Sequence, residues 1–322
     1  MLLAIWLVYL LRSTLFLFML AVLFAYLLAP LVNLVDRFLP GKRTRTVALA
    51  ISYVLVVGAV VVGAILIGSR VVDQATDLAQ TLPKTAKTWA SFFQSKVPAS
   101  MQEELVKRGN AIASSIPQYA IQFLAFMENL IYVVIVPVLA FLCLKDGALV
   151  RKHMLGLAGA GPGRKLFSDV LADIHLVLTH YMRALVLLSL ATMTTYSIVL
   201  TAMGAHFGIL LGVMAGLLEF IPMIGPLAGG VIVLVVGGAT TGHWLAIVIF
   251  LVAFRMFQDY VLSPHLMGHG VELHPLLVLF GVFGGAELAG VPGTFLSVPL
   301  LAIARVIYLR VYRSREENLE EK

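Results

Sequence analysis

The sequence predicts an all-α integral membrane protein, a polytopic bundle of about eight helices. Of its 322 residues, 60% are hydrophobic and 12% are charged, and the mean hydropathy is +0.97, whereas about 25% of residues are charged in soluble domains. Several apolar runs reach the ~20 residues that a helix needs to cross ~30 Å of hydrocarbon. The third observation is that glycine and proline interrupt two apolar segments, near 220–230 and 283–299. We expect these two segments to be broken or re-entrant.

Residues 1–69 are expected to form the N-terminal membrane helices. The run 1–10 is too short to span a membrane alone and lacks the pattern of a signal peptide, so whether it crosses stays open. Residues 14–28 and 47–67 are long enough to form apolar helices. The turn between them is basic and is expected in the cytoplasm, since it contains Arg37, Lys42, Arg43 and Arg45.

Residues 70–120 form a polar stretch that we expect to be an extramembrane amphipathic helical region. Acids and bases alternate there with Gln, Ser and Thr, and Pro83, Pro98 and Pro117 divide the stretch into short pieces. The fragment 101–112 is suited to lie on lipid headgroups or against a neighbouring subunit, although a solvated helical linker explains it as well. This region is expected on the side opposite the cytoplasm.

Residues 121–312 are expected to form the main transport domain in the membrane, and 313–322 a cytoplasmic tail. The domain contains a polar loop, 145–180, whose basic residues predict a cytoplasmic position: Arg151, Lys152, Arg164 and Lys165. The glycine-rich run 159–165 is not a phosphate-binding loop, because Leu166 follows the lysine where a Walker motif requires Ser or Thr. It is expected to be a flexible turn.

The stretch 207–230 is the one around which the chain is organised. It begins as an apolar helical run that Pro222, Gly225 and Pro226 interrupt, and Glu219 stands just before the interruption. A carboxylate at membrane depth costs roughly 2.5–3.5 kcal/mol on insertion scales. One interpretation is a kinked packing helix with a satisfied polar residue, and the other is a solute or ion site.

Two further groups of polar residues extend this hypothesis. Arg255 and Asp259 are four residues apart and can pair on one helix face, as a structural or a pathway feature. Glu287 and Pro292 lie in the second interrupted segment. Paired interrupted segments are a sequence indicator of a transporter site. The predicted solute or ion pathway therefore comprises Glu219, Pro222, Gly225, Pro226, Arg255, Asp259, Glu287 and Pro292.

Four blocks of the sequence resemble the autoinducer-2 exporter family, also called PerM-like permeases. They are FAYLLAPLVNLVDRF at 24–38, VPVLAFLCLKDG at 136–147, GILLGVMAGLLEFIPMIGPLAGG at 208–230, and QDYVLSPHLMGHGVELHPLLVLFGVFGGAELAGVPGTFLSVPLLA at 258–302. The resemblance covers nearly the whole chain and departs from the family pattern at the short first helix and at Ala184. It implies an eight-helix permease that assembles as a homo-oligomer such as a pentamer. It also implies export of a small furanosyl signalling molecule, or sodium/proton antiport as in other members.

Other classes of function find no support in the sequence. Eight histidines are present, but no HExxH motif is found, so neither a metal site nor an enzyme is expected, even for His265, His269 and His274, which share a loop. No cofactor is expected. The net charge of +6 comes from basic residues at the ends of apolar runs, so it does not indicate nucleic acid as a partner. Cys143 is the single cysteine and cannot form an internal disulfide bond.

We therefore expect a secondary transporter, a permease or exporter of a small hydrophilic solute such as autoinducer-2. A sodium or potassium/proton antiporter is the alternative within transport, and a non-transporting oligomeric scaffold is the alternative from another class. The expected location is a bacterial-type inner membrane, and the expected partners are a small solute or ion, lipids and further copies of the chain. The sequence leaves the substrate, the direction and the coupling ion open.

Overall fold

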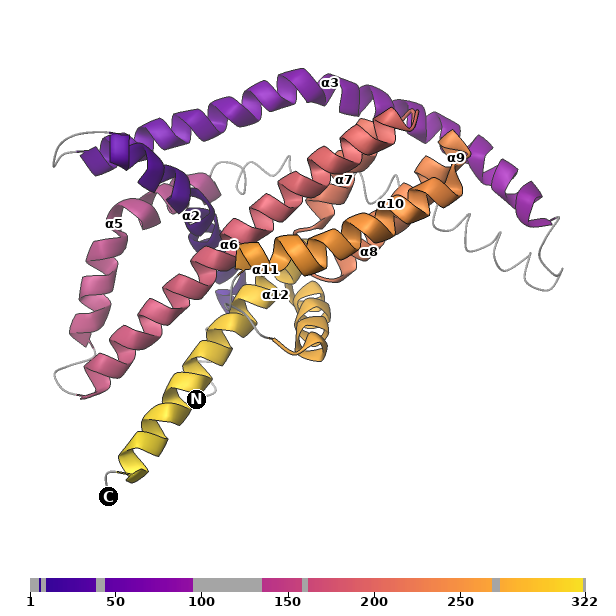
Figure 1. The fold of residues 1–322 in the computed structure, drawn as a ribbon. Helices are drawn as coiled ribbons and strands as arrows, with labels where there is room; N and C mark the ends of the chain where they lie inside the picture. Colours follow the sequence, from indigo (N-terminus) through magenta and orange to yellow (C-terminus); the bar gives the residue numbers. More distant parts are fainter. Residues whose placement is uncertain are drawn as a thin grey trace.

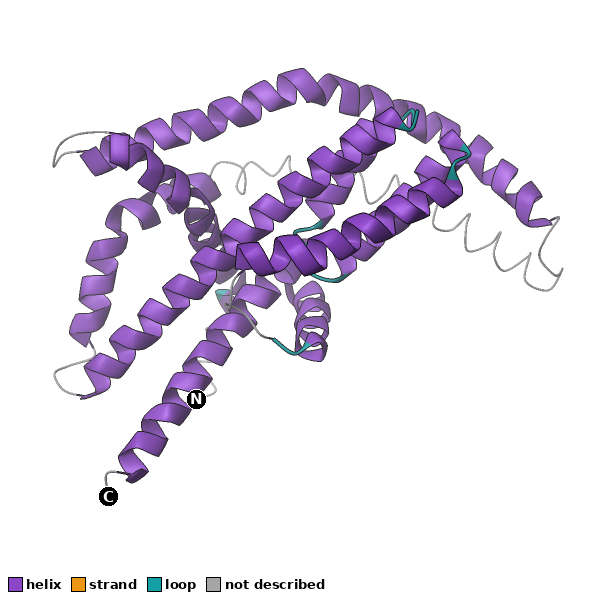
Figure 2. Cartoon of the chain, viewed as in Figure 1, coloured by secondary structure: helices purple, strands orange, loops and turns teal. Residues whose placement is uncertain are grey.

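The computed structural model of the chain describes residue 6 and residues 10–38, 44–94, 135–157, 162–267 and 273–320. The regular elements in these ranges are all helical, which confirms the predicted all-α fold (Figures 1 and 2). They are α2 (Arg12–Phe38), α3 (Thr44–Gln94), α5 (Val136–Leu157), α6 (Pro162–Ala202), α7 (Gly208–Leu218), α8 (Ile224–Ile232), the π-helical turn η2 (Val233–Gly237), α9 (Gly238–Thr241), α10 (Trp244–Phe257), the π-helical turn η3 (Gln258–Leu262), α11 (Ser263–Met267) and α12 (Pro275–Glu320).

Four helical segments in the described ranges are long and apolar enough to cross a membrane. They are Gly163–Ala202, Ile224–Thr241, Trp244–Leu266 and Pro275–Tyr312. A fifth crossing results if Thr14–Ala29 and Leu31–Phe38, which meet at an angle of 43°, count as one bent span. The total of about eight helices in the bundle stays a prediction, because part of the chain, including 101–112 and His269, lies outside the described residues.

Helix boundaries differ from those that composition indicates. α3 continues as one helix through Arg70 and Pro83, although the chain becomes polar there. α5 likewise passes Gly147 and ends at Leu157, so most of the predicted loop 145–180 consists of the ends of α5 and α6. The reason is that a helix needs only its own backbone hydrogen bonds, which polar side chains do not disrupt, and one proline removes a single donor.

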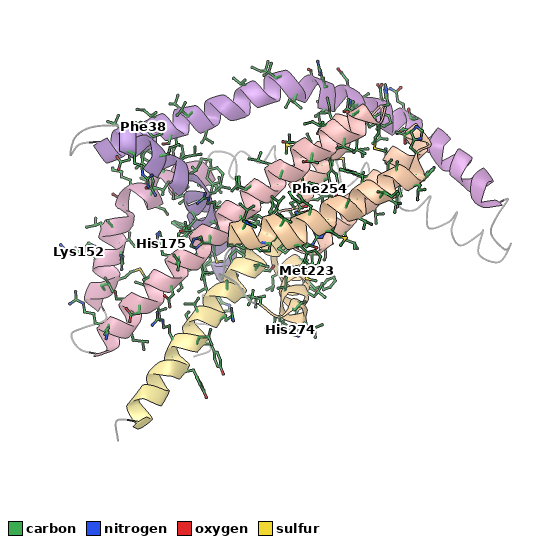
Figure 3. The ribbon with its side chains drawn as sticks, in the orientation of Figure 1. Phe38, Lys152, His175, Met223, Phe254 and His274 are labelled. Atoms are coloured by element: carbon green, nitrogen blue, oxygen red, sulfur yellow. The ribbon has the colours of Figure 1, made fainter. Side chains whose placement is uncertain are left out.

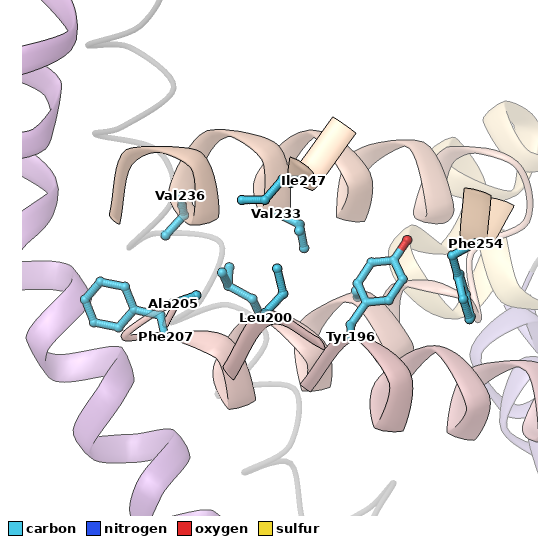
Figure 4. Close-up of a cluster of buried hydrophobic side chains, with 10 residues drawn as sticks. Tyr196, Leu200, Ala205, Phe207, Val233, Val236, Ile247 and Phe254 are labelled. Carbon is cyan, nitrogen blue, oxygen red and sulfur yellow. The ribbon is translucent and has the colours of Figure 1, made fainter. Parts of the chain in front are cut away.

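α6 is the central scaffold, because it contributes to two buried apolar clusters. The first, here called the α6–α10 cluster, is shown in Figure 4 and comprises Tyr196, Leu200, Ala205, Phe207, Leu211, Ala215, Val233, Val236, Ile247 and Phe254. The second, the α2–α12 cluster, comprises Leu23, Leu178, Tyr181, Met182, Leu185, Leu296 and Val298. The two clusters therefore lie at successive positions along α6, with residues 186–195 between them.

A seam of small residues holds α7 against α6. A Cβ on Gly208 would lie 2.6 Å from Thr201 Oγ1, and one on Gly216 would lie 2.7 Å from Met193 Cβ. A Cβ on Gly212, between them, would collide with Ser197. The spacing of four residues puts all three glycines on one face of α7, so the two backbones approach closely. α7 is thereby fixed in register along α6.

Polar contacts between helices lie near both ends of α6. Arg310 of α12 donates two hydrogen bonds to the carboxylate of Asp173 near the start of α6, at 2.5 and 3.1 Å. At the other end of α6, the Gln74 side chain of α3 accepts a 2.9 Å hydrogen bond from the Leu210 backbone N–H in the first turn of α7. Residues 70–80 and residue 310 therefore lie at opposite ends of α6 (Figure 1).

Candidate functional site

The break between α7 and α8 contains a strained turn at Met223, which Figure 3 labels. Its φ is 63° and its ψ is −50°, and the Ile224 N–H donates a 2.7 Å hydrogen bond to the Pro222 carbonyl oxygen. This geometry is that of a γ-turn with positive φ, a rare conformation that costs on the order of 1–3 kcal/mol in a non-glycine residue. Met223 is the one such residue in the described part of the chain. Such strain is retained where the surrounding structure enforces it.

Glycine and proline have separate roles in this break. A Cβ on Gly225 would collide with the Leu218 carbonyl oxygen, so only glycine lets the start of α8 approach the end of α7 so closely. Pro226 lies in the first turn of α8, where a backbone N–H has no intrahelical acceptor and its loss costs little. The break is thus produced by Pro222, Met223 and Gly225, whereas Pro226 is compatible with helix initiation.

Glu219 caps the C-terminus of α7 and lies in a buried polar cluster. Its exposed fraction is 7%, and those of Thr192 and Gln258 are 1% and 3%. Thr192 Oγ1 donates a 3.2 Å hydrogen bond to Glu219 Oε1, and the Gln258 amide donates a second hydrogen bond to the carboxylate. Residues from α6, α7 and η3 therefore meet at one carboxylate.

The predicted pair Arg255–Asp259 lies beside this cluster. Arg255 Nε donates a 2.8 Å hydrogen bond to Asp259 Oδ2, and both side chains are near enough to Glu219 to interact with it electrostatically. Arg255 and Asp259 are nearly half exposed, on a span where nearby residues such as Tyr260 are exposed and apolar. The structure thus brings together three predicted residues, which carry one positive and two negative formal charges.

The second predicted break is present in α12. Ala289 and Gly290 have non-helical backbone angles, and the φ of Gly290 is 61°. Each of Gly285 and Gly293 would collide with the other's carbonyl oxygen if it carried a Cβ, so the two arms of α12 lie back to back. The first arm, from Pro275 to the kink, is about 20 Å long and is too short to cross a bilayer alone. α12 is therefore a re-entrant hairpin followed by a long helix.

The two breaks meet through aromatic side chains and not through their acids. The ring centroids of Phe220 and Phe295 are 5.9 Å apart, and both side chains pack on the α2–α12 cluster. Pro292 lies at the start of the second arm. Glu287 is exposed, and no contact within the described ranges joins it to the Glu219 cluster. The predicted set is therefore divided between a buried cluster and an exposed hairpin.

Thr192 and Gln258 were not among the predicted site residues. Gln258 had a signal, because it follows the buried residues Ile247 and Phe254 by eleven and four positions and so shares their helix face. Thr192 had none beyond its polarity in an apolar helix, because its proximity to Glu219 is a result of the glycine seam. The tertiary contact cannot be read from either segment alone.

Some histidines contact their own segment of the chain, and others contact another helix. His265 Nδ1 lies 2.7 Å from the Val261 carbonyl oxygen, and His274 Nδ1 accepts a 3.3 Å hydrogen bond from the Leu276 N–H. His175 Nδ1 lies 3.2 Å from the hydroxyl of Tyr26. Among the described residues, no three His, Cys, Asp or Glu side chains are placed to hold a metal ion.

Comparison with known proteins assigns the family. The sequence profile of the AI-2E family transporters matches residues 1–313. Among similar proteins, "Putative transport protein YrrI" of Bacillus subtilis is 26% identical over 310 residues, covering 92% of this chain and 86% of that protein. "Putative permease PerM" of Escherichia coli K12 is 25% identical over 245 residues, covering 73% and 67%. The apolar helices and this match make the chain a multi-pass membrane protein that belongs to the AI-2E family of transporters.

Proposed function

We propose that the protein moves a small hydrophilic solute across the cell membrane through the Glu219 layer, which comprises Glu219 and its neighbours Thr192, Gln258, Arg255 and Asp259. The observation that carries this proposal is the position of this layer along α6, between the two buried apolar clusters. Glu219 contacts Thr192 of α6. Measured as rise along the helix axis, Thr192 lies about 10 Å from Leu185 of the α2–α12 cluster and about 6 Å from Tyr196 of the α6–α10 cluster. A buried carboxylate between two apolar clusters, beside a strained helix break, has the arrangement of an occluded transport site.

The leading candidate for the solute is autoinducer-2 or a similar small molecule rich in hydroxyl groups. An ionised carboxylate has about four acceptor positions, and Thr192 and Gln258 occupy two of them. Solute hydroxyl groups are suitable donors for the remaining positions. The family match supports a transporter, the resemblance of the sequence blocks to the exporter family supports export as the direction, and the basic turns support an inner-membrane location.

Cation/proton antiport is the second candidate, and one observation favours it. Glu219 stands at the C-terminal end of α7, where the helix dipole is negative, so the carboxylate and the helix end repel each other. A sodium ion or a proton relieves this repulsion. A buried acid at this end of a helix therefore favours a cation over an anion as cargo.

A non-transporting scaffold stays the alternative from another class, and assembly into a homo-oligomer is proposed with either function. Within the described structure, Gly58, Gly63 and Gly68 of α3 have no atom within 4 Å of a Cβ. These glycines therefore do not serve close packing inside the described chain and are available for a second copy. Mass measurement in lipid nanodiscs tests assembly, and a monodisperse monomer would count against it.

Flux measurement in proteoliposomes tests the function, with Glu219→Gln as the variant and Asp36→Asn of α2 as the matched control. Glutamine keeps the shape but cannot ionise. We expect Glu219→Gln to lower flux roughly tenfold, because an interaction with a charged group contributes about 1.5–3 kcal/mol. Asp36→Asn, at an exposed position outside the predicted pathway, should have little effect.

The same assay separates the candidates. Labelled autoinducer-2 and gradients of sodium or potassium are tested between about pH 5.5 and 8.5, a range wide enough to detect a carboxyl group whose ionisation is disfavoured by burial. Flux of the solute without an ion gradient supports the permease, and coupled ion and proton movement supports the antiporter. Equal flux in the parent and in Glu219→Gln contradicts a role for ionised Glu219. Absence of all flux in the parent supports the scaffold.

A further inference from the structure

The buried serine, threonine and glutamine side chains of the described residues divide into two groups by what they contact. Four of them donate to backbone carbonyl oxygens: Ser52 to Ala48, Ser189 to Gly216, Thr294 to Val291 and Ser297 to Thr294. Thr192 and Gln258 instead donate to another side chain, the Glu219 carboxylate. Three of these backbone hydrogen bonds lie within one helix and the fourth joins α6 to α7, whereas two buried donors directed at one buried acid define a position for that acid.

We infer that Thr192 and Gln258 are positioning residues, which hold the Glu219 carboxylate in one orientation and leave its other acceptor positions to the cargo. This inference rests on the proposed role of Glu219 in transport. Both donors are neutral, so they orient the carboxylate without cancelling its charge. The nearby cation, Arg255, is paired with Asp259. Neither the two donors nor Arg255 thus takes the place of a cargo at the carboxylate.

The two donors come from elements of different character. Thr192 lies on α6, which the glycine seam locks to α7. Gln258 is the first residue of η3, a π-helical turn, and such turns are frequent at functional sites. A shift of η3 relative to α6 breaks the hydrogen bond from Gln258 to Glu219 and keeps the one from Thr192 to Glu219. The Gln258 bond is therefore the one expected to change when the site opens, and the Thr192 bond is the constant one.

Carbodiimide labelling tests the positioning role without any transported substrate. Dicyclohexylcarbodiimide adds to a protonated carboxyl group in an apolar environment and gives a stable N-acylurea, whose mass is located in the Glu219 peptide. Hydrogen-bond donors stabilise the ionised carboxylate and hold it in place. We expect Thr192→Val and Gln258→Leu each to label roughly fivefold faster than the parent at fixed pH, because each removes a hydrogen bond to a charged group.

The chain offers two matched controls. Ser189→Ala removes a buried hydroxyl one turn away on α6 that contacts Gly216 and not Glu219, and Thr192→Ser keeps the donor. Both should label within about twofold of the parent, as is usual where no key contact is lost. Gel filtration confirms that each variant keeps its oligomer size, and Glu219→Gln gives the zero of the assay.

The positioning role is overturned if Thr192→Val and Gln258→Leu label at the parent rate, or if Ser189→Ala accelerates labelling as much as they do. These outcomes differ from failure of the proposed function, which is seen as unchanged flux in Glu219→Gln. Tyr196, Arg255 and Asp259 are the other titratable groups that act on Glu219. All variants leave these three unchanged, so differences in labelling report the two donors.

Discussion

At the scale of single residues, Tyr181 has a buried hydroxyl group without a hydrogen-bond partner in the described part of the chain. It lies in the α2–α12 cluster with an exposed fraction of 5%. An unsatisfied buried polar group costs about 1–3 kcal/mol. Tyr181→Phe keeps the ring and removes the hydroxyl, so we expect the free energy of unfolding to rise by about 1 kcal/mol. Thermal unfolding in mild detergent measures this change.

Tyr26→Phe is the matched control for this prediction. Its hydroxyl lies 3.2 Å from His175 Nδ1, so its removal costs a hydrogen bond between α2 and α6. The two tyrosine variants should therefore shift the unfolding temperature in opposite directions. A lower unfolding temperature for Tyr181→Phe would mean that its hydroxyl has a partner after all.

Some site residues could be predicted from the sequence because a charged side chain at membrane depth is energetically unfavourable. Glu219 and the Arg255–Asp259 pair are charged residues in apolar runs, and the free-energy cost of placing them at membrane depth indicates a functional role. Thr192 and Gln258 are uncharged, and their free-energy cost at membrane depth is lower than that of a charged residue. They therefore do not stand out in the sequence as the charged residues do. Met223 also escaped prediction, because its strain depends on a backbone angle that side-chain chemistry does not report.

At the scale of elements, the packing of α7 on α6 depends on the glycine seam. Gly212→Leu introduces a side chain where even a Cβ collides with Ser197, so α7 must move away from α6. We expect a loss of about 1–3 kcal/mol of stability, as for overpacking in other cores. Gly147→Leu on α5, where nothing lies within 4 Å, is the control and should be nearly neutral.

Stability and labelling together check this prediction. Displacement of α7 separates Thr192 from Glu219, so Gly212→Leu should also speed carbodiimide labelling of Glu219, whereas Gly147→Leu should not. Equal stability of the two leucine variants would show that the close approach of α6 and α7 contributes nothing. The seam would then be incidental.

Both helix breaks were predictable from the sequence, but helix ends were not. Gly and Pro mark the two breaks because they alter backbone geometry directly. Hydropathy, in contrast, reports where a helix is surrounded by lipid, and not where its hydrogen bonds stop. α3 therefore continues from its apolar first part to polar Gln94 without interruption.

At the scale of the whole molecule, the polar contacts near the two ends of α6 bear on the predicted topology. The Asp173–Arg310 pair lies at the end where basic residues predict the cytoplasm, and the Gln74–Leu210 contact lies at the other. We expect Lys152→Cys to react with a membrane-impermeant maleimide from the cytoplasmic side and Thr76→Cys from the opposite side. Both positions are exposed, and Cys143→Ser supplies the background.

Sealed inside-out vesicles and intact cells distinguish the two sides. Labelling of Thr76→Cys from the cytoplasm would reverse the assignment of the polar end of α3. The same membranes, opened with detergent, show whether each cysteine is reactive at all. A residue that reacts only after opening is then assigned to the protected side.

The ionic content of the Glu219 layer has an electrical consequence. With Arg255 and Asp259 paired, an ionised Glu219 leaves the layer with a net charge of −1. Moving one elementary charge through the whole membrane field involves about 2.3 kcal/mol per 100 mV. A bound monovalent cation neutralises the layer, so membrane voltage acts on the empty site and not on the loaded one. A neutral solute leaves the charge unchanged, and voltage then acts equally on both.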